Sequence, residues 1–222
     1  ELQENYNHSE CVKGPSAYQT VVNKSFMFDS SLPNSNEDCL NLNIASPKDA
    51  SNLPVMIWIH GGAYLTGSAH GALYQMETLA SRGVVLVTIN YRLGPLGFLK
   101  LDEVTNGKIL STGNEGLLDQ RLAIQWVKKN IEAFGGNPEN ITIFGESAGS
   151  WSCALQVGMG IKGDFQKVIC QSGGGDAARS IETANQWGEL FIAKCHDKNI
   201  QIDDLINATP EQLIEVAKLM RH

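Results

Sequence analysis

The sequence predicts an α/β fold built on a mostly parallel β-sheet with helices on both faces. The main observation is a set of short, continuously apolar runs that alternate with segments of helical pattern. Three of these runs predict buried strands, namely Val55 to His60, Val84 to Ile89 and Ile141 to Phe144. Strands without apolar–polar alternation are typical of a parallel sheet, because such a sheet is covered on both faces.

Two further strands and four helical segments complete the pattern. The strands are predicted at Leu40 to Ala45 and at Lys167 to Gln171, the latter as an apolar strand. The helical segments are Leu73 to Ser81, Leu117 to Phe134, Ser150 to Val157 and much of the chain from Ser180 to His222. A glycine-rich loop that contains Pro95 follows the strand ending at Ile89.

The segment from Leu117 is the longest predicted helix, and its apolar residues recur at helical spacing. The residues on or near its apolar face are Leu118, Leu122, Trp126 and Ile131. The pair Gly135-Gly136 ends the helix, and Thr209 before Pro210 predicts the N-cap of the last one. The tryptophans are expected in the core because all lie in apolar patterns: Trp58, Trp126, Trp151 and Trp187.

The composition is that of a folded domain with an acidic surface. The chain has 222 residues, of which 42% are hydrophobic, and a formal net charge of -7. The acidic balance argues against nucleic acid or an anionic membrane as a main partner. No apolar run approaches the roughly 20 residues of a membrane span, and the first residues do not resemble a signal peptide. Residues 1–222 show no clear linker, so we treat them as one unit, which would also suit part of a larger domain.

The pentapeptide Gly145 to Gly149 carries the strongest chemical signal. It has the pattern G-x-S-x-G, and it stands between a predicted strand and a predicted helix. This context predicts a nucleophile elbow, in which Ser147 sits on a strained turn with its Oγ exposed. Glycine on both sides leaves room for the neighbouring strand and helix. The alternative is a tight strand-to-helix turn without chemistry.

A second element is the sequence His60-Gly61-Gly62-Ala63 at the end of its strand. Backbone N–H groups in a glycine-rich turn can hold a developing oxyanion, because no side chain stands in the way. The residue after a nucleophile, here Ala148, supplies one more N–H. Alone, such a turn is commonly only a turn, but the ends of two parallel strands are where such loops converge on a ligand. His60 is expected to brace the turn rather than to take a proton.

These residues resemble the type B carboxylesterase and lipase family, which includes the cholinesterases and has the α/β-hydrolase fold. The resemblance covers roughly residues 36 to 175, in the family's order and spacing. The stretches that carry it are EDCLNLN from Glu37, PVMIWIHGGA from Pro54, NYRLGPLGF from Asn90, GNEGLLDQ from Gly113, FGGNPENITIFGESAG from Phe134 and QSG from Gln171.

The resemblance implies an acyl-enzyme mechanism. It makes Ser147 the nucleophile and the N–H groups of Gly62, Ala63 and Ala148 the oxyanion hole. Gly61 would shape the turn and Glu146 would line the substrate pocket. The implied substrate is a small-molecule ester, and no cofactor or metal is implied. Cholinesterases carry a tryptophan in the loop between the first two cysteines, and its absence here disfavours choline esters.

The general base and its carboxylate are not found at the expected place. In α/β-hydrolases they follow the serine in the order acid, then histidine, after further strands. No strand pattern remains after Gln171, and the family's usual first strands are absent too. We therefore expect an internal portion of a longer enzyme, incomplete at both ends, whose partner would be the remainder of that enzyme.

Three alternatives remain at this point. A compact triad could pair Asp176 with His196, or Asp203 with His222, although both histidines lie in helical stretches. A non-catalytic, neuroligin-like binding domain is a second, but such domains have lost the nucleophile that is present here. The third is an inactive fragment.

The five cysteines bear on cellular location. Cys11 and Cys39 bracket a polar stretch that suits a disulfide-closed loop, and they correspond to a loop disulfide in the family. Cys153 and Cys170 are expected as buried thiols. The resemblance implies a free Cys195, because the family's partner for a cysteine at this place is missing here. The predicted bridge favours a secreted or extracellular protein, with a cytoplasmic one as the alternative.

Overall fold

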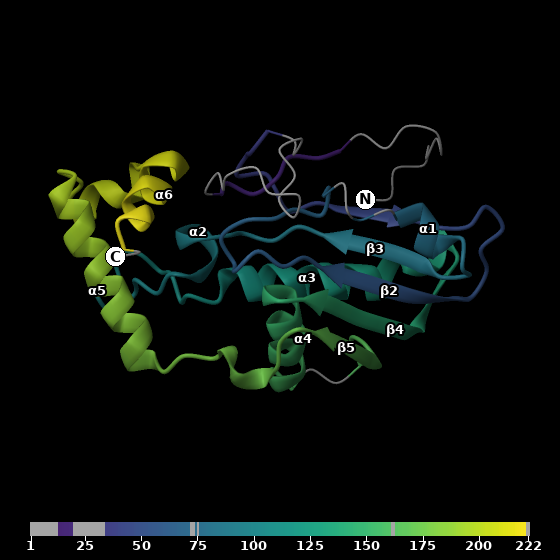
Figure 1. Cartoon of the computed structure of the whole chain (residues 1–222). Helices are drawn as coiled ribbons and strands as arrows, with labels where there is room; N and C mark the ends of the chain where they lie inside the picture. Colours follow the sequence, from purple (N-terminus) through teal and green to yellow (C-terminus); the bar gives the residue numbers. More distant parts are fainter. Residues whose placement is uncertain (1–12, 20–33, 72–73, 75, 161–162, 221–222) are drawn as a thin grey trace.

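The structure, a computed structural model, describes residues 13–19, 34–71, 74, 76–160 and 163–220. Its centre is a five-stranded sheet with the strand order β1-β3-β2-β4-β5 (Figure 1). The strands are β1 Leu42–Ala45, β2 Leu53–Ile59, β3 Val85–Ile89, β4 Gly136–Glu146 and β5 Lys167–Gln171. Only β1 runs antiparallel to its neighbour, so the predicted mostly parallel sheet is confirmed.

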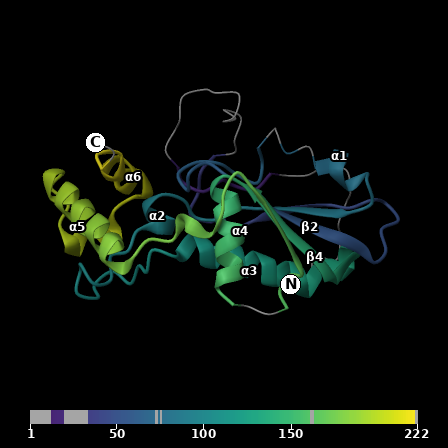
Figure 2. The same cartoon turned by 60° about the horizontal axis from the view of Figure 1, so that its bottom comes forward.

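Helices cover both faces of the sheet, as the sequence predicted. Helices α3 and α4 lie along one face, and α1 lies on the other side, near β1 and β3 (Figure 2). The helices are α1 Met76–Ala80, α2 Pro95–Phe98, α3 Glu115–Asn130, α4 Ala148–Gly158, α5 Ile181–Asp197 and α6 Pro210–Lys218, with short 3-10 turns η1 Ile131–Phe134, η2 Gly175–Ala177 and η3 Ile202–Asn207. Helix α2 interrupts the loop that contains Pro95, with proline at its first turn, where no N–H is needed.

The middle strands form the core. Every residue of β3 is buried, and the inward side chains of β2 and β4 are fully covered. The register pairs Ile57 with Val87 on one side and with Ile143 on the other. It also places the end of β2 beside the end of β4, since Ile59 pairs with Gly145. The two predicted site segments therefore leave the sheet side by side.

Helices α5 and α6 form a second apolar cluster beyond the end of the sheet (Figure 1). Phe191 and Cys195 of α5 are almost fully buried in it, and Cys195 is a free thiol, as predicted. The predicted N-cap is confirmed: the Thr209 hydroxyl accepts from the N–H of Gln212, whose side chain in turn accepts from the N–H of Thr209.

The predicted apolar face of α3 is wrong for three of its four residues. Leu118, Leu122 and Trp126 are 45%, 60% and 40% exposed. The buried side of α3 instead carries Leu117, Gln120, Ile124 and Val127. Buried Gln120 is tolerated there because its amide donates to the hydroxyl of Ser152 on α4.

The expected burial of Cys170 and of two tryptophans is also wrong. Cys170 is exposed rather than buried, because β5 is exposed along most of its length. Trp126 and Trp187 are also exposed, at 40% and 48%, so an apolar helical pattern did not place these rings in the core. Within the described residues no helix is long and apolar enough to span a bilayer.

Candidate active site

Ser147 occupies a strained turn between β4 and α4. Its backbone has φ 54° and ψ -120°, a conformation that costs energy for any residue other than glycine. Its N–H donates to the carbonyl of Gln171 on β5, at 2.9 Å, which holds the turn against the neighbouring strand. Its side chain is half-buried. These features match the predicted strand–turn–helix context.

The glycines of the pentapeptide are required by close backbone contacts. A β-carbon built on Gly149 would lie 2.0 Å from the carbonyl oxygen of Ile59. One built on Gly145 would lie 2.5 Å from the carbonyl carbon of Gly149. No side chain fits at either position without moving the backbone, so the sharp turn at Ser147 depends on both.

The turn after β2 lies directly against Ser147. A β-carbon on Gly61 would lie 3.3 Å from the Cβ of Ser147 and 2.7 Å from the carbonyl oxygen of Glu146. The Glu146 carboxylate approaches the same point, with Oε2 at 3.0 Å. Gly62 and Ala63 have positive φ angles of 112° and 55°.

The backbone N–H groups around the Gly61-Gly62 turn, which we call the diglycine corner, are free to bind a substrate oxygen. Within the described residues, the N–H groups of Gly62, Ala63 and Ala148 have no acceptor, whereas the carbonyl of Gly62 accepts from Leu65 and Thr66 at 2.9 and 3.0 Å. Ala148 is the first residue of α4, where backbone N–H groups have no intrahelical partner and the helix dipole favours negative charge.

No described histidine forms a hydrogen bond with Ser147. His60 and His70 are buried and engaged in other hydrogen bonds: Nδ1 of His60 with the carbonyl of Gly61 at 2.8 Å, and Nε2 of His70 with Oδ1 of Asn41 at 3.0 Å. Burial lowers the pKa of His60 to about 4 and also lowers that of His70. Both rings are therefore neutral near pH 7. His196 is exposed near the end of α5.

The compact triads are not assembled among the described residues. No hydrogen bond joins Asp176 to His196 there, and the carboxylate of Asp203 pairs with Lys108 on the surface. His8 and His222 lie outside the described residues. So does Cys11, and the Cys11–Cys39 disulfide with its loop therefore stays a prediction, although Cys39 is buried.

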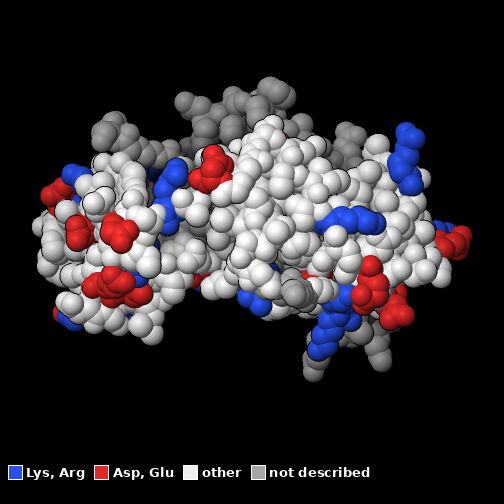
Figure 3. All heavy atoms as spheres, turned by 90° about the horizontal axis from the view of Figure 1, so that it is seen from below, with Lys and Arg blue, Asp and Glu red and all other residues white. Residues whose placement is uncertain are grey.

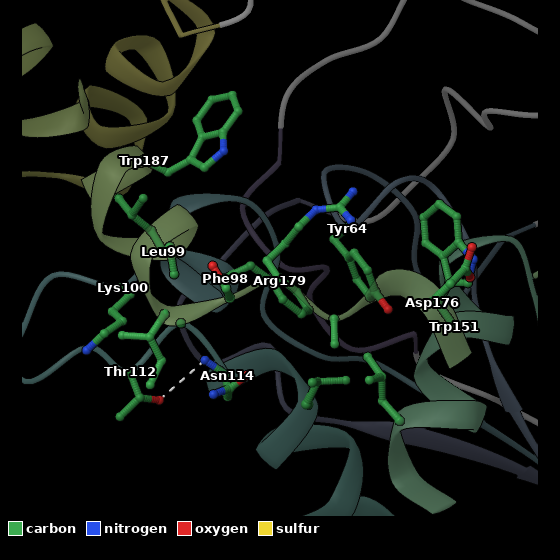
Figure 4. Close-up of a pocket in the computed structure, with 17 residues that line it drawn as sticks. Tyr64, Phe98, Leu99, Lys100, Thr112, Asn114, Trp151, Asp176, Arg179 and Trp187 are labelled. Carbon is green, nitrogen blue, oxygen red and sulfur yellow. Dashed lines mark hydrogen bonds between the residues drawn. The ribbon is translucent and has the colours of Figure 1, made fainter. Parts of the chain in front are cut away.

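A cavity of about 490 Å³ lies between α4 and α5 (Figure 4). Trp151 forms one wall, and Trp187 of α5 lies on the opposite side. The backbone N–H of Trp151 donates to the carbonyl of Ser147 at 3.0 Å. Tyr64 and Phe98 line the space between them. Ser147 itself does not line this cavity, so the cavity is a neighbour of the elbow rather than its pocket.

Two supports near the site were missed by sequence reasoning. Arg92 binds Asp119 of α3 through two side-chain hydrogen bonds of 2.8 and 2.7 Å. Tyr91 is fully buried against His60. Both lie in stretches that carry the family resemblance, NYRLGPLGF and GNEGLLDQ, which is the signal that could have found them. The described residues hold no cluster of acidic, histidine or cysteine side chains suited to a metal.

Comparison with known proteins gives the same family throughout. The carboxylesterase family matches residues 5–217. The chain is 44% identical over 195 residues to para-nitrobenzyl esterase of Bacillus subtilis, covering 86% of this chain and 39% of that protein. It is 54% identical over 171 residues to bile salt-activated lipase of Bos taurus, covering 72% of this chain and 27% of the lipase.

The solved structures agree. A thermophilic pNB esterase superposes with a TM-score of 0.85 at 40% identity, over 95% of this chain and 43% of that one. The chain thus spans less than half the length of these relatives. The match includes the turn, the elbow and the parallel sheet, and the chain belongs to the carboxylesterase family.

Proposed function

We propose that residues 1–222 form the nucleophile-bearing part of a carboxylic ester hydrolase. One observation carries the proposal: Ser147 is held on a strained turn against a diglycine corner whose N–H groups have no acceptor among the described residues. Such a corner is suited to receive negative charge as it develops on a substrate oxygen.

The chemistry would follow the acyl-enzyme route. The Oγ of Ser147 attacks the ester carbonyl carbon and loses its proton to a base. The carbonyl oxygen becomes an oxyanion, which the N–H groups of Gly62, Ala63 and Ala148 stabilise. Collapse of this intermediate expels the alcohol after it takes up the proton, and water then releases the acid.

The base and its orienting acid would come from outside this chain. In support, no described histidine forms a hydrogen bond with Ser147, and the ring nitrogens Nδ1 of His60 and Nε2 of His70 are bonded elsewhere. The partner we propose is the remainder of the same enzyme, consistent with relatives more than twice as long. The retained Ser147 and its flanking glycines favour this reading over a non-catalytic binding domain.

The proposed substrate is a small-molecule ester, with Gly61 and Glu146 beside the reacting carbonyl. Choline esters stay disfavoured, on the missing tryptophan. A secreted or extracellular location rests on the Cys11–Cys39 pair, since disulfides persist in oxidising compartments.

A fluorophosphonate tests the proposal, because it reacts with an activated serine. The enzyme that contains this chain should be labelled rapidly at Ser147, and the Ser147→Ala variant should not be labelled. Residues 1–222 alone should be labelled slowly at best. Rapid labelling of residues 1–222 would contradict the external base, whereas an unlabelled Ser147 in the whole enzyme would contradict the nucleophile.

A further inference from the structure

The buried rings of His60 and Tyr91 pack against the diglycine corner, and the mechanism above does not use them. His60 follows β2 and Tyr91 follows β3 by two residues, and both are almost fully buried, at 1% and 0% exposed. Since β2 and β3 are parallel and in register, both rings lie at the same end of the sheet. They stack with centroids 4.4 Å apart and planes 17° from parallel.

Two hydrogen bonds, one from each side chain, join this pair to the start of the turn. The Tyr91 hydroxyl donates to the carbonyl of His60 at 2.7 Å, and Nδ1 of His60 lies 2.8 Å from the carbonyl of Gly61. A carbonyl oxygen only accepts, so Nδ1 must carry the ring proton. Nε2 is then unprotonated, and it is buried without a partner among the described residues.

The bond from Nδ1 of His60 sets the direction of an N–H group on the other side of the turn, and the bond from Tyr91 holds the peptide that precedes it, between His60 and Gly61. A trans peptide is planar, with its C=O and N–H pointing in opposite directions. The carbonyl of Gly61 belongs to the same peptide as the N–H of Gly62, so holding that carbonyl on His60 aims the N–H away from His60. The carbonyl of Gly62, held by Leu65 and Thr66, orients the N–H of Ala63 in the same way.

The loop at Gly67 packs directly against the imidazole of His60 and leaves no room for a side chain. A β-carbon on Gly67 would lie 2.4 Å from Nδ1 of His60 and 2.6 Å from the carbonyl oxygen of Gly61. Glycine at this position lets the chain pack directly on the bond between the ring and the turn. The ring therefore cannot rotate away without displacing backbone.

We propose that Tyr91 and His60 are positioning residues that fix the oxyanion-binding peptides of the turn. This proposal rests on the proposed ester hydrolase function. Neither side chain would touch the substrate. Their effect should appear in the chemical step, because an oxyanion needs its donors aimed at the transition state, whereas the ground-state ester depends on them much less.

Substitutions in the whole enzyme that contains this chain test the role. Tyr91→Phe keeps the ring and removes only the hydroxyl. We expect kcat to fall about 10- to 100-fold with KM nearly unchanged, somewhat less than the loss of a whole oxyanion donor. Thr105→Val is the control, because it removes another buried hydroxyl, bonded to the carbonyl of Leu101 in the second cluster, and it should leave kcat unchanged.

A pair of variants at His60 separates positioning from packing. His60→Asn keeps an N–H donor near the place of Nδ1 and should retain most of kcat. His60→Leu fills similar space without a donor and should lose about as much kcat as Tyr91→Phe. Equal losses in the two His60 variants, or an unchanged kcat in Tyr91→Phe, would overturn the proposal.

Nuclear magnetic resonance on residues 1–222 gives a readout that does not depend on activity. We expect the His60 ring as the Nδ1–H tautomer in the wild-type chain, and finding the Nε2–H tautomer would overturn the proposal. Ser147→Ala, assayed beside the other variants, reports on the hydrolase function alone. Retained turnover there would end the ester hydrolase proposal, while the tautomer still decides how His60 holds the turn.

Discussion

Strands β3 and β5 have the same length and belong to the same sheet, yet their surroundings are opposite. All five residues of β3 are buried, whereas four of the five in β5 are exposed. β3 pairs with β1 and β2, but β5 pairs only with β4 among the described residues. The face seen in Figure 3 carries few charged side chains across its middle.

The difference teaches that an apolar strand is buried only where neighbours flank it and helices cover it. Ile169 of β5 is 44% exposed, and an open edge of this kind is a ready site for another strand. The exposed apolar residues of α3, Leu118, Leu122 and Trp126, likewise have no neighbour that covers them among the described residues. Both agree with the proposal that further chain of the same enzyme packs against this part.

The largest effect should come from truncating equivalent side chains in the middle and at the edge. Ile143→Ala removes a fully buried side chain and should lower the free energy of unfolding by about 4 kcal/mol. Ile169→Ala in β5 should cost less than about 1 kcal/mol, because its side chain already contacts water. Urea denaturation of residues 1–222 measures both. Equal losses would mean that β5 is covered in solution.

A second prediction concerns the close backbone contact between the end of β2 and the elbow. Gly149→Ala would place a β-carbon 2.0 Å from the Ile59 carbonyl and should destabilise the chain by about 3 kcal/mol. The matched control is Gly158→Ala at the end of the same helix, where nothing lies within 4 Å. It should stabilise by about 0.5 to 1 kcal/mol, since alanine is the better helix former. A mild Gly149→Ala would show that the elbow can relax.

The third prediction is a pH dependence from the buried end of β2. The pKa of His60 falls from 6.5 to about 4 on folding, because burial penalises the charged ring. Between these values the unfolded chain binds more protons, so stability rises with pH. Lowering the pH from 7 to 5 should therefore reduce the free energy of unfolding by about 2 kcal/mol through this group. His60→Asn should remove that part of the slope, and an unchanged slope would contradict the buried neutral ring.

The smallest effect is one of reactivity rather than stability. Cys170 on β5 is exposed and should react quickly with a thiol reagent in the folded chain. Cys153 is fully buried on α4, and burial raises its pKa to about 12, so it should react only on unfolding. Cys170→Ser should remove one fast thiol, whereas Cys195→Ser, at a buried position, should remove none. If Cys170→Ser leaves the fast thiols unchanged, the edge of β5 is protected.

Much of the fold and of the candidate site was predictable because its signals are local. Runs of apolar residues predicted β2, β3 and the second half of β4, and Thr209 before Pro210 predicted the cap of α6. The elbow at Ser147 and the turn at Gly61-Gly62 were predictable because glycine is needed wherever backbones approach this closely.

The remaining features depend on which segments meet across the sheet. The sequence by itself determined most of the strands, the G-x-S-x-G pattern at Ser147 and the Gly61-Gly62 turn, since each can be recognised from a few consecutive residues. Only the tertiary structure decided that His60 stacks on Tyr91, that Arg92 binds Asp119, and that Leu122 and Ile169 face outward. An apolar side chain can be buried only by a partner, and that partner lies far away in sequence.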